Sequence, residues 1–478
     1  MKTDFDIIVI GAGSAGLGAA LVPAKFGLKV LQIVKSDHQI GGDCLNEGCV
    51  PSKALIHISK IIHDAKKSTQ LGLKINGEID IQKVTSYIHD RQEIIRKHEN
   101  AKWLAQQGIE VVLGLAKFHS KNSIAVNDKI YTGKYIVIAT GSKPAKLKVK
   151  GAELVKTINN ESIFHINQLP KRLLVVGAGP IGIELGQALS RLGSEVTFIQ
   201  RGNRILPHDD AEVSEILLQQ LKAEGIKFEM NAEVDHFLNE TEALVKYKGG
   251  KTSTLSFDAV LVAVGRELVT DTLSLEKAGI KMENCKIKAD KYLRTTNPKV
   301  YLAGDIAGSL MFSHAAEQHV RLIMNNFFSP FKKRLNNDNL SWVTFTDPQV
   351  ATFGLNEKTL QERNINYKRL ELDFKDDDRA VTDDYRYGKI VLFMRSGSFL
   401  SKKVLLGGSM VAPEAGEMVQ ELILANTAKL SVKKILNKIY PYPTASRVNQ
   451  KILSEDLTSG LTDGIKTVLR FLFGKFVR

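Results

Sequence analysis

The chain carries two copies of one strand–turn–helix signature, and this repeat constrains its fold more than any other feature. An apolar run at 7–10 and another at 173–176 each lead into a glycine-rich turn followed by a helical stretch. The glycines are Gly11, Gly13 and Gly16 in the first copy and Gly177, Gly179 and Gly182 in the second. The first glycine of such a turn permits the bend, the second lets backbone approach a pyrophosphate, and the third lets helix and strand pack closely. One copy is weak evidence, but two copies in this context predict two bound dinucleotides.

Two cysteines follow the first copy, four residues apart, in the run 41–53. A dithiol that closes into a small ring beside a bound dinucleotide is a device for passing an electron pair. Cys49 falls at the start of a predicted helix over 50–60, with Pro51 suited to its first turn. A thiolate there is stabilised by the helix dipole, which lowers its pKa. The alternative is that Cys44 and Cys49 are ordinary buried thiols.

Composition bounds the class of protein. The 478 residues suggest about three domains at roughly 150 residues each. With 43% hydrophobic and 25% charged residues, the chain is typical of soluble globular proteins. No apolar run reaches about 18 residues, so no membrane-spanning helix is expected. The strand at 7–10 follows the first residue so closely that we expect no signal peptide. Three cysteines exclude a disulfide framework and predict no metal site, and a cytoplasmic location fits them.

The formal net charge is +14. Such an excess suits binding to nucleic acid or a membrane, or it reflects a surface rich in lysine. The positive residues are spread along the chain rather than blocked, which favours the second interpretation and predicts no nucleic-acid partner.

The residues after each glycine motif bear on which nucleotide binds. An acidic residue about 20 positions on usually holds a ribose hydroxyl. No carboxylate stands near Val34, and the second copy offers Gln200, Arg201 and Arg204 instead. Arginine at this corner favours a 2′-phosphate, so NADPH is expected over NADH; the alternative is that both arginines are solvated surface residues.

Four further segments look like signatures of one protein family. They are 139–142 with Thr140 and Gly141, 262–266 with Gly265, 302–305 with Gly304 and Asp305, and 345–348. Together with the glycine motifs and the cysteine run, they make the chain resemble the pyridine nucleotide–disulfide oxidoreductases, among them dihydrolipoamide dehydrogenase, glutathione reductase and mercuric reductase. The likeness runs over nearly the whole length.

The resemblance implies an α/β fold with two Rossmann-like domains and a C-terminal α+β dimerisation domain. An FAD domain would take 1–150 and 285–335, an NAD(P) domain 151–284, and the interface domain of a homodimer 340–478. Thr140, Gly141, Gly304 and Asp305 would contact FAD, and Gly265 and Arg201 would contact NAD(P). The polar stretch 327–339 is expected to be a junction.

The resemblance also assigns roles. Cys49 would contact the flavin and Cys44 would attack the incoming small-molecule acceptor. Lys53, one helical turn beyond Cys49, would favour reduced flavin and pair with Glu184. Hydride from NAD(P)H would reduce the flavin, which opens the disulfide, and the dithiol would pass its electrons on by exchange.

The pattern breaks near the C-terminus. Familiar members use a histidine there as general base, oriented by a glutamate; here those places hold Tyr442 and Arg447. Tyrosine titrates near pH 10 and histidine near pH 6.5, so Tyr442 is a poor base at neutrality. It would donate a hydrogen bond, act as a phenolate if Arg447 lowered its pKa, or only pack at the interface. Mercuric reductases manage with a tyrosine near this place, but they need a C-terminal cysteine pair that this chain lacks. Val34 and the pair at 268–269 also depart from the family.

Three functions remain open. The first is a disulfide reductase similar to dihydrolipoamide dehydrogenase. The second is a reductase of metal ions or quinones, which need no thiol protonation. The third is a non-catalytic redox sensor, against which the set of Cys44, Cys49, Lys53 and Glu184 argues.

The C-terminal tail is a predicted amphipathic helix. Its apolar residues recur at steps of three and four: Ile465, Val468, Leu469, Leu472, Phe473 and Phe476. Its positive residues are Lys466, Arg470, Lys475 and Arg478. The stripe indicates either a helix packed on its own dimer or one that binds a membrane surface or a partner.

Overall fold

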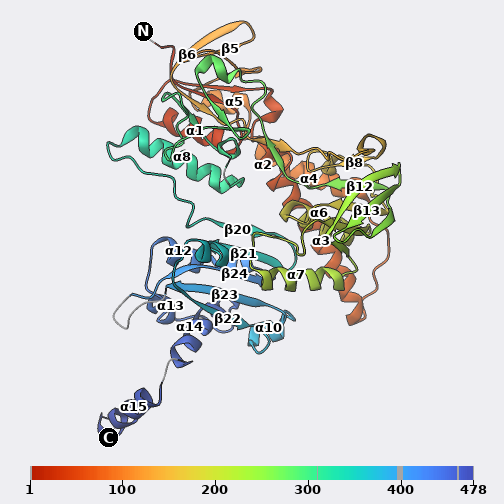
Figure 1. The fold of residues 1–478 in the computed structure, drawn as a ribbon, viewed down its shortest axis with the longest axis vertical. Helices are drawn as coiled ribbons and strands as arrows, with labels where there is room; N and C mark the ends of the chain where they lie inside the picture. Colours follow the sequence, from red (N-terminus) through yellow and green to blue (C-terminus); the bar gives the residue numbers. More distant parts are fainter. Residues whose placement is uncertain (1–2, 309, 396–401, 460–461, 477–478) are drawn as a thin grey trace. The chain divides into compact units, whose positions relative to one another are not determined.

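A computed structural model describes residues 3–308, 310–395, 402–459 and 462–476 (Figure 1). The chain divides into two compact units, one formed by 1–203 with 226–336 and the other by 204–225 with 337–478. Among the described residues, no helix combines the length and apolar character that crossing a bilayer requires.

The first unit contains the sheet of the first predicted Rossmann-like domain. Its apolar strands pair in parallel in the order β3-β2-β1-β6, and β19 joins β6 from far along the sequence, which brings 300–302 beside 136–138. An antiparallel meander, β4-β5-β6, extends the other side. The strands are β1 (Phe5–Ile10), β2 (Val30–Val34), β3 (Ile109–Leu113), β4 (Lys117–Ser120), β5 (Ser123–Val126), β6 (Lys129–Ile138) and β19 (Val300–Leu302).

Helices of the first unit follow the capping rules of their sequences. Asp80 accepts from the backbone N–H groups of Gln82 and Lys83, and Asn100 accepts from that of Trp103, so each begins a helix. The helix predicted over 50–60 runs from Cys49 to Ser68. The helices are α1 (Ser14–Lys25), α2 (Gly42–Asn46), α3 (Cys49–Ser68), α4 (Ile81–Arg96), α5 (Ala101–Gln106), α6 (Pro180–Leu192) and α8 (Ser313–Phe328).

A second parallel sheet, in the order β11-β10-β9-β15-β8, follows the second glycine motif. An antiparallel sheet of three strands, β12-β13-β14, adjoins it in sequence. The strands are β8 (Thr157–Ile158), β9 (Arg172–Val176), β10 (Glu195–Gln200), β11 (Lys227–Met230), β12 (Ala232–Asn239), β13 (Glu242–Tyr247), β14 (Thr252–Ser256) and β15 (Ala259–Val262). Two short ladders complete the unit: β7 (Ser142–Pro144) with β16 (Arg266–Leu268), and β17 (Met282–Glu283) with β18 (Lys286–Ile287).

The second unit is built on an antiparallel sheet in the order β20-β21-β24-β23-β22. Its strands are β20 (Ser341–Thr344), β21 (Gln349–Gly354), β22 (Tyr367–Asp373), β23 (Lys389–Arg395) and β24 (Leu405–Ala412). Its helices are α7 (Ala211–Ala223), α9 (Glu357–Glu362), α10 (Asp378–Thr382), α11 (Ala415–Met418), α12 (Gln420–Thr427), α13 (Lys433–Leu436), α14 (Val448–Ser459) and α15 (Asp463–Phe476). The fold class is the predicted one: parallel α/β sheets in the first unit and an α+β arrangement in the second.

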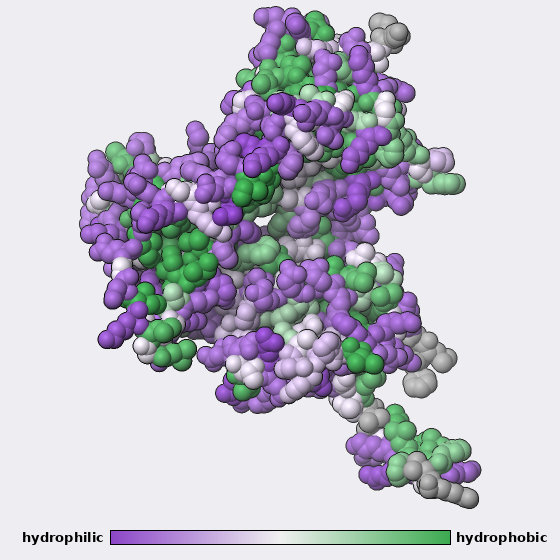
Figure 2. Space-filling view, turned by 180° about the vertical axis from the view of Figure 1, so that it is seen from behind, coloured by the Kyte–Doolittle hydropathy of each residue, from purple (hydrophilic) through white to green (hydrophobic). Residues whose placement is uncertain are grey.

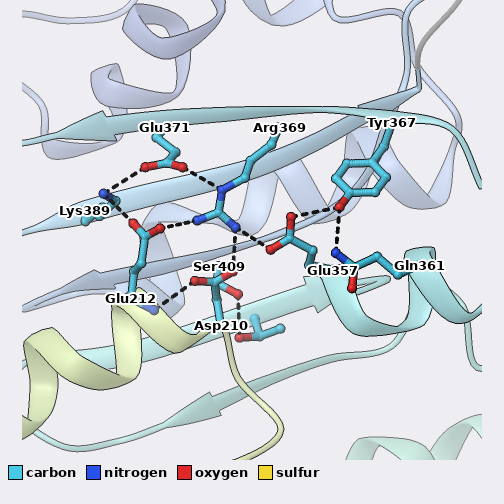
Figure 3. A network of polar contacts seen from close by, with 10 residues as sticks. Asp210, Glu212, Glu357, Gln361, Tyr367, Arg369, Glu371, Lys389 and Ser409 are labelled. Atoms are coloured by element: carbon cyan, nitrogen blue, oxygen red, sulfur yellow. Dashed lines mark hydrogen bonds and ion pairs between the residues drawn. The ribbon is translucent and has the colours of Figure 1, made fainter.

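Helix α7 lies in the second unit although the sequence places it within the predicted 151–284 domain. Buried Asp209, just before it, accepts hydrogen bonds from Trp342 and Thr352 at 2.8 and 2.6 Å. Arg369 meets Asp210 at 3.2 Å and Glu212 at 2.7 Å (Figure 3). These polar contacts hold α7 to the C-terminal sheet.

Candidate redox site

The cysteine run packs directly against the first glycine motif. Gly41 N–H donates to the Ala12 carbonyl at 2.8 Å. Gly41 and Gly42 have φ of 89° and 57°, and a Cβ on Gly42 would stand 2.5 Å from the Gly13 Cα. Only glycine permits this turn and this approach. The two motifs that sequence reasoning singled out therefore form one site.

Cys44 and Cys49 form a hydrogen-bonded dithiol, and the structure makes the two thiols unequal. The hydrogen bond from Cys44 lowers the pKa of Cys49 to about 6, with help from Ser313, 3.3 Å away, and from the charge of Lys53; desolvation opposes the shift. The same bond, together with burial, raises the pKa of Cys44. The geometry therefore holds a thiolate at Cys49, at the start of α3, and a protonated thiol at Cys44.

Lys53 and Glu184 come together as the sequence suggested. Lys53 Nζ donates to Glu184 Oε2 at 2.8 Å and to Ser52 Oγ at 3.3 Å. The Glu184 side chain is 8% exposed, so the pair joins α3 to α6 from a buried carboxylate. This pair fixes an ammonium one turn from Cys49.

Arg266 links three sequence signatures in one chain of contacts. Its Nε donates to Ser142 Oγ at 2.7 Å, and Ser142 Oγ donates to Asp305 Oδ2 at 2.6 Å. Its other end meets Asp43 of the cysteine run at 3.1 Å. The pKa of Asp305 is raised, because burial outweighs the lowering effects of the Ser142 hydrogen bond and the Arg266 charge. Asp305 is thus positioned at the edge of the first sheet, beside the cysteine run.

The first glycine turn has the shape of a pyrophosphate cradle. A Cβ on Gly11 would meet the Ala139 carbonyl at 2.3 Å, and one on Gly16 would meet the Gly11 carbonyl at 2.1 Å. The turn leads into α1, whose first N–H groups and dipole favour anions. Thr140 Oγ1 donates to the Val269 carbonyl at 2.8 Å, while Gly141 has open space around it. These residues fit a flavin dinucleotide.

The second turn repeats this geometry at α6. A Cβ on Gly177 would meet the Ala263 carbonyl at 2.4 Å, whereas one on Gly179 would meet nothing within 4 Å. Gly182 packs against the Gly177 carbonyl, and Gly265 takes φ of 126° in open space. Gln200 Oε1 accepts the Ala178 N–H at 3.2 Å, which ties the turn to β10. The open face at Gly179 suits a second pyrophosphate.

A pocket of about 300 Å³ opens where β10 and β11 end. Arg201, Lys246 and Lys248 line it, with Glu233 as the acidic neighbour. Arg204 is not among the lining residues, and its guanidinium donates to the Pro207 carbonyl at 2.6 Å. Of the two arginines that the sequence offered for a 2′-phosphate, the pocket contains Arg201.

Tyr442 belongs to the second unit, and its hydroxyl donates to Asp378 Oδ2 at 3.0 Å. This hydrogen bond and the charge of Asp378 raise the pKa of Tyr442. Arg447 stacks over the ring at 5.2 Å and lowers the pKa, but Asp378 prevails. The phenolate that the sequence left open is therefore disfavoured, and Tyr442 is a hydrogen-bonded phenol.

Sequence reasoning missed four residues of the site: Asp43, Glu47, Arg266 and Ser313. Burial raises the pKa of Glu47 to about 7, and Glu161 and Asp43 add to the rise against Arg266. Asn160 donates both to Asp43 and to the Glu47 carbonyl, at 3.3 and 3.1 Å. The position of Glu47 between the two cysteines could have identified it as a candidate site residue from the sequence.

In the described chain, no group of three or more histidine, cysteine or acidic side chains is arranged to hold a metal ion.

Comparison with known proteins agrees with this geometry. The family model for pyridine nucleotide-disulphide oxidoreductases matches residues 5–319, and the model for their dimerisation domain matches 340–452. A dihydrolipoyl dehydrogenase of Thermus scotoductus is 34% identical over 455 residues, which cover 93% of this chain and 96% of that protein. A mercuric reductase of Lysinibacillus sphaericus is 31% identical over 93% of this chain and 81% of its own. The HOCl-induced flavoprotein disulfide reductase RclA from Escherichia coli shares the fold, with a TM-score of 0.82 at 24% identity over 94% of this chain and 99% of that one.

Proposed function

This chain belongs to the pyridine nucleotide-disulphide oxidoreductase family, and we propose that it carries electrons from NADPH through FAD and the Cys44–Cys49 pair to a disulfide acceptor. It is a flavoprotein oxidoreductase that uses a pyridine nucleotide, and the match to the family's dimerisation domain supports a homodimer. A dithiol that must be kept reduced suits the cytoplasm, where we place it.

The observation that carries the proposal is the inequality of the two thiols. Cys49 is held as a thiolate, while Cys44 keeps its proton. A thiolate beside the first dinucleotide cradle is positioned to face the flavin. With Cys49 engaged there, Cys44 is the thiol left to attack an acceptor once it has given up its proton.

Thiol–disulfide exchange with the acceptor uses both of these sulfurs in turn. Cys44 passes its proton along the hydrogen bond to Cys49 and attacks one sulfur of the acceptor, forming a mixed disulfide. The other acceptor sulfur leaves as a thiolate and takes the proton from Cys49. Cys49 then attacks Cys44, releases the second acceptor thiol, and closes the Cys44–Cys49 bond. Two electrons and one proton leave the thiol–thiolate pair, a second proton comes from water, and the acceptor disulfide becomes two thiols.

When bound, the flavin supplies hydride acceptance from the nicotinamide and reduction of the disulfide. The residues that would hold it are Gly11, Gly13 and Gly16 at the pyrophosphate, and Asp305, Thr140 and Gly141 at the sheet edge. Lys53, fixed by Glu184, places positive charge where reduction would concentrate negative charge.

The basic pocket supports NADPH over NADH. A 2′-phosphate carries close to two negative charges at neutral pH, and Arg201, Lys246 and Lys248 offer matching charge at the end of β10. Replacing Lys246 and Lys248 with glutamine should raise the KM for NADPH about tenfold or more and leave that for NADH within about twofold. Equal effects on both coenzymes would contradict the assignment.

A second acceptor class, metal ions or quinones, is favoured by Tyr442. Its bond to Asp378 makes it a hydrogen-bond donor rather than a base. Acceptors that need no thiol protonation tolerate this change better than disulfides do.

An anaerobic acceptor panel tests the proposal. Wild type and Cys44→Ser are compared on lipoamide, glutathione disulfide, mercuric and cupric ions, and a water-soluble quinone, with NADPH. We expect a disulfide to be reduced by the wild type and not by Cys44→Ser. Reduction of quinone alone, unchanged in Cys44→Ser, would mean that the flavin bypasses the thiols; absence of turnover with every acceptor would favour the sensor.

A further inference from the structure

The C-terminal helix α15 presents an apolar stripe that its own chain does not cover. Six side chains recur at steps of three and four along 465–476, and they are 39–75% exposed. The residues are Ile465, Val468, Leu469, Leu472, Phe473 and Phe476. Phe471 adds a further exposed ring beside the stripe. Figure 2 shows hydrophobic surface, in green, on the terminal helix.

Positive side chains border the stripe on both sides. On a helical wheel of 3.6 residues per turn, Lys466 and Arg470 lie along one edge and Lys475 lies along the other. The one acidic residue, Asp463, meets Lys466 at 3.2 Å in the first turn. Arg478, which the sequence adds to this set, lies outside the described residues. The arrangement is an apolar face with cationic margins.

Within the described residues, every recorded polar or ring contact of α15 stays between Thr462 and Phe476. The Thr462 hydroxyl accepts from the Ile465 N–H, Lys466 pairs with Asp463, and Lys475 lies over the Phe471 ring at 5.9 Å. No side chain of α15 is buried, and no α15 residue belongs to the core cluster of the second unit. The described chain therefore leaves the stripe exposed.

We propose that α15 binds flat on the surface of an anionic phospholipid bilayer. With 14 residues it is about 21 Å long, too short to cross a hydrocarbon core of about 30 Å. A helix that lies in the interface needs an apolar face and cationic margins rather than length. Lysine and arginine keep their charge among the headgroups while their stems extend along the apolar side.

Charge decides between this occupant and a second copy of the helix. A two-fold pair of α15 helices would bring Lys466, Arg470 and Lys475 of one copy against those of the other, since such an interface is self-complementary. An anionic lipid surface turns the same charges into attraction, worth a severalfold gain in affinity for each. The net charge of +14 acts in the same direction.

Dimerisation strengthens the attachment. A single short interfacial helix binds weakly and reversibly, but two helices on one homodimer engage the same surface at high effective concentration. The enzyme would thus distribute between solution and membrane according to the anionic lipid content.

The test is vesicle co-sedimentation of the full-length flavin-loaded dimer. We expect binding to vesicles of phosphatidylcholine with about one third phosphatidylglycerol, little binding to phosphatidylcholine alone, and loss of binding as salt is raised. Deletion after Ser459 should abolish binding. Lys466→Glu/Arg470→Glu/Lys475→Glu should reduce the partition coefficient at least tenfold, as should Leu469→Asn/Phe473→Asn.

A matched control reverses two exposed lysines on another helix. Lys433→Glu/Lys434→Glu changes the total charge but leaves α15 intact, so binding should fall less than about threefold. Size-exclusion chromatography and NADPH oxidation should be unchanged in every variant. Equal binding to neutral vesicles, an equal loss in the control, or dissociation of the dimer on deletion after Ser459 would each overturn the proposal.

Discussion

At the scale of single residues, the hydrogen bond between Cys44 and Cys49 sets the chemistry. Cys44→Ala removes the donor that most lowers the pKa of Cys49, so this pKa should rise from about 6, because desolvation is then opposed only by Ser313, Lys53 and the helix start. Cys44→Ser keeps a hydroxyl donor and should therefore raise the pKa of Cys49 by less. Ultraviolet thiolate absorbance against pH, in a Cys285→Ser background, measures both. No difference between the two variants would contradict the hydrogen-bond explanation.

Glu47 gives a second prediction at this scale. Its folded pKa of about 7 lies above the ordinary 4.5, so ionisation is disfavoured in the folded state. This group's contribution to stability is present below pH 4.5 and is lost as the pH rises through 7. Glu47→Gln should therefore match the wild type near pH 4 and melt a few degrees higher at pH 8, while the exposed-site control Glu78→Gln should not. Thermal melts across this pH range measure it; a variant less stable at pH 8 would count against the assignment.

Residue identities at the site were predictable where a motif fixes them. The glycines and both cysteines stand in motifs that few other residues could fill, so the pattern located them, whereas the family resemblance supplied Lys53 and Glu184. Asp43, Glu47, Arg266 and Ser313 escaped because their roles depend on neighbours distant in sequence. Ser313, for example, meets Cys49 across 264 positions.

At the scale of elements, Arg369 on β22 is the centre of a charge network. It meets four carboxylates within 3.2 Å: Asp210, Glu212, Glu357 and Glu371 (Figure 3). Lys389 on β23 shares Glu212 and Glu371 with it. The network ties α7 and α9 to the sheet.

Arg369→Met should destabilise the fold by about 2–3 kcal/mol, because it leaves clustered carboxylates without their main cation. Hydrogen exchange in α7 should rise in the same variant. Arg363→Met is the matched control: its pair with Asp338 is half exposed, so the loss should stay below about 1 kcal/mol. Urea denaturation compares them, and equal losses would show that the network adds nothing to an ordinary surface pair.

Element prediction succeeded for strands next to glycine motifs and for α15, whose periodicity is unambiguous. It fell short for α3, which continues to Ser68. Segment 204–225 was assigned by its place in the sequence, whereas side chains as far away as Arg369 determine what it packs against. Such long-range pairing has no local signature.

At the scale of the whole molecule, like charge opposes assembly. Each chain carries +14, so bringing two together works against repulsion that added salt screens. We expect the dimer dissociation constant to fall severalfold between about 20 and about 300 mM sodium chloride. Sedimentation of a species twice the 52.9 kDa chain mass, followed to low concentration, measures this. A dimer that weakens with salt would instead mean that ion pairs between subunits dominate.

The interleaving of 204–225 with the C-terminal unit bears on how this gene tolerates recombination. A crossover placed at residue 337 would join a foreign C-terminal module to a resident α7, separating Asp209 from Trp342 and Thr352, and Arg369 from Asp210 and Glu212. Chimaeras between relatives should therefore remain viable only when both stretches descend from the same parent.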